Sequence, residues 1–458
     1  MIYLTLIRKI MNKRALYCTV ICLYLSFSGF AQVYEDFNLS EYVTPDIVRS
    51  QLDFSLRTAG SFTDNETSKN DLFRINGDLN TAFDKYKNTR PYWNRQLLVV
   101  GMSGNYRNEL KEKKSDYGLT FNYQNVNRFY TSDMRFFEVS PSVDVQLLGY
   151  KTGGLLVDVK THNNSYYANI PMSVGKGRIE QVEDARQAIY ILENLDKQGV
   201  LNRKLTTEEI HAFAQTISTV KNKRFLDARL RMIDEITTVD SVLVNMGVLS
   251  SGGAPYFTTL YDYWMYGDLF SRGSGTVYKV GLTPFINHRN YNNVSDLQSV
   301  KLTGTGVTAK LSYENEKPLN LYWQQSIWAE ASGSYWHSKI NLPSDNTSHM
   351  VDMGLNGRYT LGYYPTSRTN VNFGFDESLY WGQRTYKDTP EPNNKYTFLT
   401  SYTGAFVDLY YYISPQFRFA LNANLGLRYT DNIKPKQDDP KNLMWTGNFV
   451  AKLTYSLF

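Results

Sequence analysis

Cysteine is almost absent from the sequence. The only two, Cys18 and Cys22, both lie before residue 31, so a chain that starts after that point forms no disulfide and no thiolate metal site. Long apolar runs are also scarce. After residue 31 no stretch approaches the roughly 18 to 20 apolar residues of a membrane-spanning helix, which excludes a helical membrane protein. An aromatic content of 15% excludes a disordered chain.

Motifs of catalysis are missing too. The sequence has no glycine-rich phosphate loop, no zinc-protease motif and no nucleophile elbow. A large excess of positive or negative charge is missing as well. The formal net charge of +5 falls to +1 without residues 1–31, which hold four basic residues and no acidic ones. Nucleic acid is therefore not expected as a partner. We predict that the protein is not an enzyme and holds no cofactor or metal.

Residues 1–31 have the pattern of a cleavable signal peptide. Basic residues precede an apolar run, Ala15–Phe27, and small side chains at Gly29 and Ala31 suit cleavage after Ala31. Met11 is an alternative start. A lipoprotein signal is not indicated, because neither cysteine follows a small residue.

What the sequence does contain is alternation of apolar and polar residues with a period of two, from about residue 50 to 170 and from about 275 to 458. In residues 417–430, one face carries Leu421, Leu425 and Leu427, and the other carries Asn422, Asn424 and Arg428. Such strands fit a soluble sandwich, whose apolar face is the core. They also fit an outer-membrane barrel, whose apolar face meets lipid.

Three features favour the barrel. The polar stripes mix Gly, Ser, Asn and Thr with charges, as a crowded lumen would. Aromatic residues gather near strand ends, as in membrane girdles. Tight turns alternate with longer polar loops, for example Pro365–Arg368 and Asn341–Ser348. The expected girdle residues include Tyr335, Trp336, Tyr363, Tyr364, Trp381, Tyr410, Tyr411 and Tyr412.

On the signal peptide, the alternation, the aromatic strand ends and a last strand ending in Phe458, the chain resembles bacterial outer-membrane β-barrel proteins of porin-like type. The Ala31-Gln32 junction and tyrosine-rich strands resemble members of the Bacteroidota. The resemblance implies an antiparallel transmembrane barrel in the cell outer membrane. Its expected partners are outer-membrane lipid and, during insertion, the barrel-assembly machinery. The terminal apolar stripe, Phe449 to Leu457, is one residue out of phase with Phe458 and departs from the usual assembly signal.

Counting the alternating segments predicts about 14 strands, with 12 to 16 possible. We expect about six in residues 32–175 and about eight in residues 271–458, separated by a small helical insert over residues 176–270. Because eight strands separate this insert from a periplasmic C-terminus, we predict a periplasmic insert.

The insert is expected to hold three short amphipathic helices, near residues 182–199, 206–217 and 225–236, which must pack together or on the barrel rim. The aromatic segment Tyr256–Phe270 is an interfacial anchor, a plug or part of that packing. One group of basic residues could bind an anionic periplasmic partner such as peptidoglycan, or be a solvated face paired with nearby acids. It comprises Lys221, Lys223, Arg224, Arg229 and Arg231.

Charged residues of the polar stripes are candidates to line the lumen. They include Arg57, Asp78, Asp144, Lys160, Asp352, Arg358, Asp376, Arg418 and Arg428. Their mixed signs predict no strong ion selectivity. They either frame a weakly selective channel or pair across a filled interior.

Three functions follow. The first is a porin-like channel or transporter for small solutes. The second is a structural or docking protein whose insert binds an envelope partner or the cell wall. The third is a surface hydrolase that uses histidines near the outer strand ends, His288, His337 and His349, with Asp296, Asp345 or Ser348.

Overall fold

The computed structural model describes residues 34, 36–63, 72–109, 112–153, 159–223, 232–250, 253–266, 271–293, 298–341, 345–387, 394–414, 417–434 and 442–455. The predicted signal peptide lies outside these residues. The chain up to Phe37 is a unit of its own, and every element below belongs to Asn38–Phe458.

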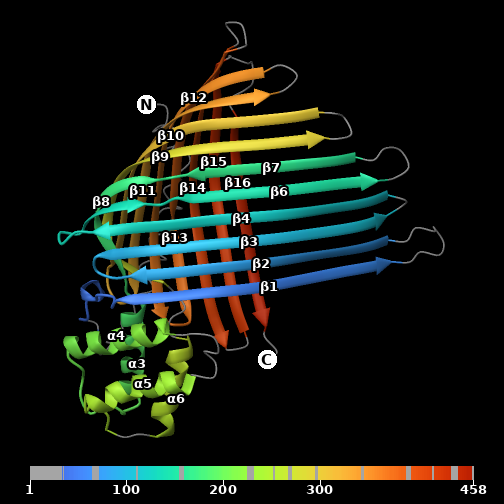
Figure 1. Cartoon of the computed structure of the whole chain (residues 1–458). Coiled ribbons are helices and arrows are strands. Elements are labelled where there is room, and N and C mark those ends of the chain that lie inside the picture. The colour runs from blue at the N-terminus through green and yellow to red at the C-terminus, as the bar shows by residue number, and fades with distance from the viewer. Residues whose placement is uncertain are drawn as a thin grey trace, which may run out of the picture. The chain divides into compact units, whose positions relative to one another are not determined.

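Sixteen strands form one antiparallel sheet (Figure 1). The strands are β1 (Ile47–Thr63), β2 (Leu72–Asn88), β3 (Tyr92–Glu109), β4 (Glu112–Tyr130), β5 (Arg135–Val139), β6 (Ser142–Gly153), β7 (Val159–Asn169), β8 (Met172–Gln181), β9 (Gly273–Asn293), β10 (Gln298–Pro318), β11 (Trp323–Asn341), β12 (Asp345–Thr366), β13 (Thr369–Tyr386), β14 (Lys395–Ser414), β15 (Phe417–Lys434) and β16 (Asn442–Tyr455). The helices are η1 (Leu39–Glu41), α3 (Glu183–Lys197), α4 (Thr207–Asn222), α5 (Met232–Asn245) and α6 (Ala254–Tyr266).

The sixteen strands make fourteen passes. β4 pairs with β5 near the helices and with β6 further along, and β9 pairs with β8 and β7 in the same way. β5 with β6, and β7 with β8, are therefore each one pass interrupted at Pro141 or Pro171. Proline has no N–H to give to the ladder, so pairing breaks there. The predicted antiparallel barrel of 12 to 16 strands with a helical insert is confirmed.

Two predicted boundaries were wrong. Six passes precede the insert, as predicted, but the insert begins at Glu183 and not at residue 176, because residues 172–181 continue the sheet as β8. Glycine hid this strand: Gly177 has a φ of +104°, and a Cβ there would lie 1.8 Å from the Thr276 carbonyl oxygen. The outer loop expected over Asn341–Ser348 is also shorter, since β11 reaches Asn341 and β12 begins at Asp345.

The insert lies at the end of the sheet where the first strand begins and the last strand ends. β1 begins, β16 ends and α3 to α6 connect β8 to β9 at this end, as the strand parity predicted (Figure 1). The other connections at this end are short, such as residues 89–91 and 367–368. At the opposite end the strand bounds are further apart in the sequence, as between Thr63 and Leu72 and between Tyr386 and Lys395. We call the two ends the insert end and the far end.

The sheet has an apolar and a polar face. In β12 the exposed fractions of Met353 and Leu355 are 59% and 56%, whereas that of Asp352 is 7%. Facing residues continue the pattern, with Met353 opposite Trp381 and Asp352 opposite Gly382. An exposed apolar face is the reverse of a soluble sandwich, which buries it. The fold is that of a transmembrane antiparallel β-barrel, with its polar face on the inside.

Aromatic pairs mark the insert end of the apolar face. Ring centroids are 4.6 Å apart in Trp323–Tyr363 and 5.0 Å apart in Tyr278–Tyr313. From Tyr363 to Val351, near the far end of β12, the strand runs about 40 Å at ~3.4 Å per residue. At a tilt of about 45° this spans about 30 Å, the thickness of a hydrocarbon core.

Not every expected girdle residue belongs to this face. Tyr335, Tyr363, Trp381 and Tyr411 do, by their register. Tyr364 and Tyr412, only 8% and 5% exposed, and also Trp336 and Tyr410, belong to the polar face. The girdle prediction was wrong for these four because consecutive aromatic residues alternate between faces.

The insert contains four helices rather than three. α3 is its centre, with Ala185, Ile189 and Leu192 fully buried. The predicted capping box of Thr206 and Glu209 begins α4. The additional helix is α6, whose Trp264 is 2% exposed and donates from Nε1 to Glu235 Oε2 at 3.0 Å. Within the described residues, the segment Tyr256–Phe270 is therefore part of the packing of the insert.

Candidate functional site

Of the nine charged residues named above as lumen candidates, eight lie on the polar face and one, Lys160, does not. Arg57 stands opposite Asp78. Arg358 makes two hydrogen bonds with Asp376, one of them 3.1 Å from Nη2 to Oδ2. Asn122 donates to Asp144 at 3.2 Å. The remaining members are Asp352, Arg418 and Arg428. The mixed-sign polar face therefore exists as a continuous surface.

Lys160 was assigned to the wrong face. It lies directly opposite Lys151, on the same face as Val145 and Tyr166, which is the apolar face. The alternation in β7 is weak, because its apolar-face positions also carry His162 and Asn164. Only the pairing with β6 shows which residues of β7 lie on the apolar face and which on the polar face.

A three-residue ion cluster that the sequence analysis did not identify lies on the polar face. Glu138, 5% exposed, accepts hydrogen bonds from Arg128 Nε at 2.7 Å and from Lys279 Nζ at 3.0 Å. Arg128 also stacks on the Phe136 ring, 4.4 Å from its centroid. Arg128 lies in a stretch whose alternation is irregular, so only the strand pairing identifies it as a partner.

The ion pairs of the polar face run along the wall of the sheet. Arg358–Asp376 joins β12 to β13, and Lys310–Glu330, at 3.2 Å, joins β10 to β11. Arg95–Asp84, at 3.1 Å, joins β3 to β2. These three pairs each join neighbouring strands, whereas Lys279–Glu138 joins β9 to β5 on the other side of β8.

The histidines proposed for catalysis lie on the apolar face. His349 Nδ1 is 2.9 Å from Tyr335 Oη, and the His337 and His349 rings are 4.7 Å apart. Ser348, by contrast, bonds Ser338 at 2.8 Å on the polar face. The structure therefore separates this serine from the histidines by the thickness of the sheet. Asp296 and the Asp345 side chain lie outside the described parts.

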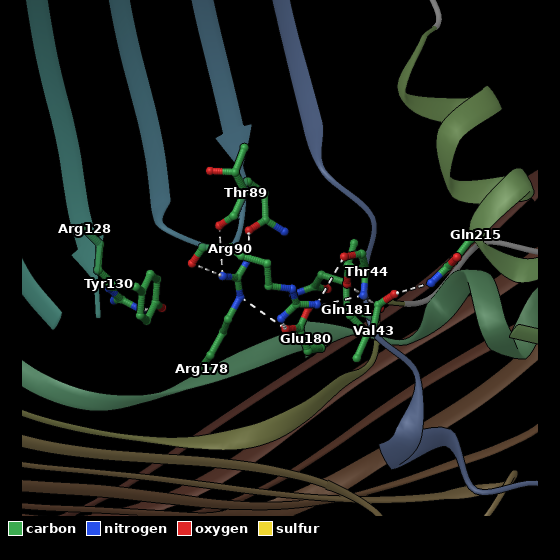
Figure 2. Close-up of polar contacts among 11 residues, drawn as sticks. Val43, Thr44, Thr89, Arg90, Arg128, Tyr130, Arg178, Glu180, Gln181 and Gln215 are labelled. Carbon is green, nitrogen blue, oxygen red and sulfur yellow. Dashed lines mark hydrogen bonds and ion pairs between the residues drawn. The ribbon is translucent and has the colours of Figure 1, made fainter. Parts of the chain in front are cut away.

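A polar cluster at the insert end ties distant segments together (Figure 2). Arg178 of β8 donates from Nη1 to the carbonyl oxygens of Thr89 and Arg90, in the turn between β2 and β3, at 3.0 and 3.2 Å. Glu180 bridges both arginines, at 2.6 Å from Arg90 and 3.2 Å from Arg178. The end of β8 is thus fixed to a turn that is not its neighbour in the sheet.

The segment before β1 joins this cluster to the helices. Thr44 Oγ1 donates to the Gln181 carbonyl oxygen at 3.3 Å, and Gln215 of α4 donates to the Val43 carbonyl oxygen at 3.3 Å (Figure 2). Tyr42 is fully buried. The insert is therefore attached to the N-terminal side of the rim.

A second attachment lies on the other side of the insert. Arg272, 2% exposed, donates to the carbonyl oxygens of Leu321 at 2.6 Å, Asn320 at 3.0 Å and Trp323 at 3.1 Å. Arg368 and Asp262 add an ion pair of 3.3 Å between the β12–β13 turn and α6. These contacts hold the insert against rim turns on both sides.

Buried charge is concentrated at these attachments. Burial lowers the pKa of Arg272 to about 10, and the Arg186 guanidinium adds to the shift. Burial likewise raises the pKa of Glu183 to about 7, helped by the adjacent Asp184 carboxylate. Arg186, 3% exposed, stacks 3.8 Å from the centroid of the Tyr190 ring.

Of the predicted basic group of the insert, the structure describes Lys221 and Lys223, which differ in exposure. Lys221 is partly buried and forms an ion pair with Asp184 at 2.9 Å. Lys223 is exposed. The other three members, Arg224, Arg229 and Arg231, lie outside the described residues.

Within the described ranges, no helix is long and apolar enough to cross a membrane. No cluster of three or more His, Cys, Asp or Glu residues suits a metal ion in the same part of the chain.

No family model matches the chain, and no curated protein matches it. Solved structures do. The β domain of the Bordetella autotransporter BrkA is 11% identical, with 80% of this chain and 99% of that chain covered and a TM-score of 0.22. OmpT of Vibrio cholerae with loop L8 deleted is 7% identical, with 88% and 99% covered and a TM-score of 0.23. CdiB from Acinetobacter baumannii is 9% identical, with 90% and 66% covered and a TM-score of 0.27. Scores this low do not define a shared fold, so the membrane orientation derives from the side chains of the sheet itself.

Proposed function

We propose that the protein is an outer-membrane β-barrel channel for small hydrophilic solutes, with a helical insert at its periplasmic mouth. The observation that carries this proposal is the direction of the ion pairs on the polar face. A filled, closed interior needs charges matched across the lumen. The pairs Arg358–Asp376, Lys310–Glu330 and Arg95–Asp84 run between neighbouring strands instead, so these charges are satisfied at the wall and leave the interior to water.

The number of passes supports the same conclusion. Eight-stranded barrels are just wide enough for their side chains to fill, and diameter grows roughly in proportion to strand number. Fourteen passes therefore leave more space than wall side chains occupy. The described contacts of the insert are with rim turns, not with the middle of the polar face.

Outer-membrane barrels keep both termini and their short turns in the periplasm. The insert end has these properties, so the insert belongs on the periplasmic side in this proposal. Among the described residues, β1 pairs with β2 alone and β16 with β15 alone. Fourteen passes make these two edges antiparallel, and hydrocarbon tolerates no open edge. In the membrane, β1 and β16 are expected to pair.

Single-channel recording in planar bilayers tests the channel. The folded chain should give discrete current steps with weak ion selectivity. Biotin attached to a cysteine at the exposed position Lys197 then allows streptavidin to be added from one side. Bound streptavidin should reduce the current only when it is added on the insert side of the bilayer. A matched cysteine at Asn341, at the far end of β11, should respond only from the other side. Inserted barrels without current steps would contradict the channel.

A second candidate function is docking to an envelope partner through the insert. The observation that favours it is an exposed aromatic pair on α6, Phe257 and Tyr261, 54% and 41% exposed with rings 6.4 Å apart. Ile233 of α5 is 74% exposed. Photocrosslinking from position 257 in cells would capture a periplasmic protein or peptidoglycan if the insert docks. The same probe at Lys197 is the control.

A further inference from the structure

Two histidines face each other at the far end of the apolar face. His337 of β11 is directly opposite His349 of β12 in the register of the sheet. Their Nδ1 atoms are 3.4 Å apart, and their ring centroids are 4.7 Å apart. Directly opposed residues of an antiparallel pair have Cβ atoms only about 4.5 to 5.5 Å apart. The backbone of two paired strands therefore holds both imidazoles at one place, and no loop is needed to bring them together.

The hydroxyl of Tyr335 belongs to the same group of polar atoms. Its Oη is 2.9 Å from His349 Nδ1, so this nitrogen has two polar neighbours within hydrogen-bond distance. An imidazole nitrogen carries either one proton or one lone pair, so it makes one good hydrogen bond. The second contact is then weak or repulsive. A metal ion between the two nitrogens removes this conflict, because it takes both lone pairs and leaves the hydroxyl to a water molecule on the metal.

The spacing of the two nitrogens suits a tetrahedral metal ion. Zinc binds imidazole nitrogen at about 2.0 to 2.1 Å in tetrahedral sites, which places two such nitrogens about 3.3 to 3.4 Å apart. The separation of His337 Nδ1 and His349 Nδ1 is 3.4 Å. Neighbouring nitrogens of a square-planar site, which copper(II) prefers, are closer, at about 2.8 Å. Magnesium and calcium prefer oxygen ligands. Zinc is therefore the ion that fits the pair best.

The position of the pair on its strands leaves it accessible to water. The stretch of β12 that matches the hydrocarbon core ends near Val351, and His349 lies two residues beyond it. At ~3.4 Å per residue and a tilt of about 45°, this is about 5 Å further from the bilayer centre. Both imidazoles are partly exposed. Lys387, whose charge acts on His349, is exposed, so water and salt screen its repulsion of a metal ion.

We propose that His337 and His349 bind a zinc ion that joins β11 to β12 at the far end of the barrel. Two protein ligands leave two tetrahedral positions for water or another ligand. This departs from the expectation of no metal, because only the register of the two strands makes these histidines direct neighbours. The inference does not depend on whether the barrel conducts, since both ligands belong to the apolar face.

The test is Zn²⁺ binding by the full chain folded in phosphatidylcholine nanodiscs and purified with a tag that contains no histidine. Cys18 and Cys22 are replaced by serine in every sample, so that no thiol binds zinc. Affinity is measured by competition with a chromophoric chelator. The variants are His337→Gln and His349→Gln, and circular dichroism verifies their strand content.

The matched control is His162→Gln/His288→Gln, which removes two other histidines of the apolar face. Their direct partners across the sheet are not histidines. His162 Nδ1 lies 3.3 Å from the hydroxyl of Tyr117, and His288 Nδ1 lies 2.9 Å from that of Thr303. The control therefore removes as much imidazole as the double loss of the pair would, but from separate places.

The wild type should bind a single Zn²⁺, and either substitution in the pair should weaken binding at least about tenfold, since the second of two linked ligands binds intramolecularly. The control should bind as the wild type does. Lowering the pH from about 7.5 to about 5 should release the ion, because only neutral imidazole is a ligand. Magnesium should not displace it. Equal affinity in the wild type and both variants of the pair, an equal loss in the control, or displacement by magnesium would overturn the proposal.

A second measurement needs no variant. Because a ligand that binds the folded state alone stabilises it, saturating Zn²⁺ should raise the urea midpoint of the wild-type barrel, and Mg²⁺ should not. The control should show the same rise, and His337→Gln should show none. An unchanged midpoint in the wild type, or the same rise in His337→Gln, would contradict a zinc ion shared by β11 and β12.

Discussion

Asp352 and Met353 are consecutive in β12, yet the first side chain is 7% exposed and the second 59%. The carboxylate faces the serine and glycine residues of neighbouring strands, Ser334 and Gly382, while the thioether stands beside Trp381 on the open face. In water this arrangement would be costly, because the more apolar side chain is the more exposed. In a bilayer the apolar face is in contact with lipid and the polar face with water inside the barrel. Both residues then lie in suitable surroundings.

A lysine placed at Leu425 tests whether the apolar face is in contact with lipid. Leu425 is 56% exposed on the apolar face, and its neighbour Asn424 is exposed on the polar face. Leu425→Lys should reduce the free energy of unfolding in lipid vesicles by about 2 to 4 kcal/mol, because it puts charge in hydrocarbon. Asn424→Lys should change it little. Similar losses at both positions, measured by urea unfolding, would show that the faces are assigned wrongly.

The topology of the insert can be read from cysteine labelling. Since Cys18 and Cys22 are the only native cysteines, a chain from Gln32 onward has none. A cysteine at Lys197 should stay unlabelled by a membrane-impermeant maleimide in intact cells and react after the outer membrane is opened. A cysteine at Asn341 should label in both conditions. Labelling of Lys197→Cys in intact cells would place the insert outside.

Arg272 should matter far more than Arg368 for attachment of the insert. Arg272→Ala removes the donor to three carbonyl oxygens, and the bond to Leu321 is buried, so its loss leaves a buried unsatisfied group that costs about 1 to 3 kcal/mol. Arg368–Asp262 is partly exposed, and such ion pairs contribute about 0 to 1 kcal/mol. Protease cleavage of the insert should therefore accelerate at least tenfold in Arg272→Ala and little in Arg368→Ala. Equal rates would mean that Arg272 is not an anchor.

The stability of the insert should fall as pH rises toward neutral. Burial raises the folded-state pKa of Glu183 to about 7 from an ordinary value of 4.5. The folded insert therefore binds this proton more tightly than the unfolded chain does. Its contribution is complete below pH 4.5 and is lost as pH rises through about 7. Glu183→Gln should remove most of this dependence, by about 1 to 3 kcal/mol. The check is thermal unfolding of the helical signal at pH 5 and pH 8. An unchanged slope in the variant would assign the dependence to another group.

The sequence predicts the barrel because each long strand repeats one simple contrast. Residues 417–430 are on the faces that their alternation indicates, and so are eight of the nine lumen candidates, the exception being Lys160. The alternation depends on whether each face of a strand is in contact with lipid or with water. The two faces can therefore be predicted without knowing which strands pair. The fourteen passes follow for the same reason.

What could not be predicted depends on pairing between strands or on residues without alternation. β8 was missed because Gly175 and Gly177 give no apolar signal on either face. Lys160 was placed wrongly because only its register with Lys151 reveals its face. The attachments of the insert use backbone carbonyl oxygens as acceptors, as at Arg272. Every residue has such an oxygen, so residue types do not indicate which ones are used. α6 was not recognised as a helix because its aromatic residues equally suit a membrane interface.

The most direct measurement of the central claim compares the labelling of two cysteines, at Met353 and Asn424. Both native side chains are exposed, one on each face. With the chain folded in lipid vesicles and a small water-soluble maleimide added, we predict rapid reaction at Asn424→Cys and protection at Met353→Cys. Both should react after unfolding in denaturant. Rapid reaction at Met353→Cys with protection at Asn424→Cys, in chains that have inserted, would contradict a water-filled lumen lined by the polar face.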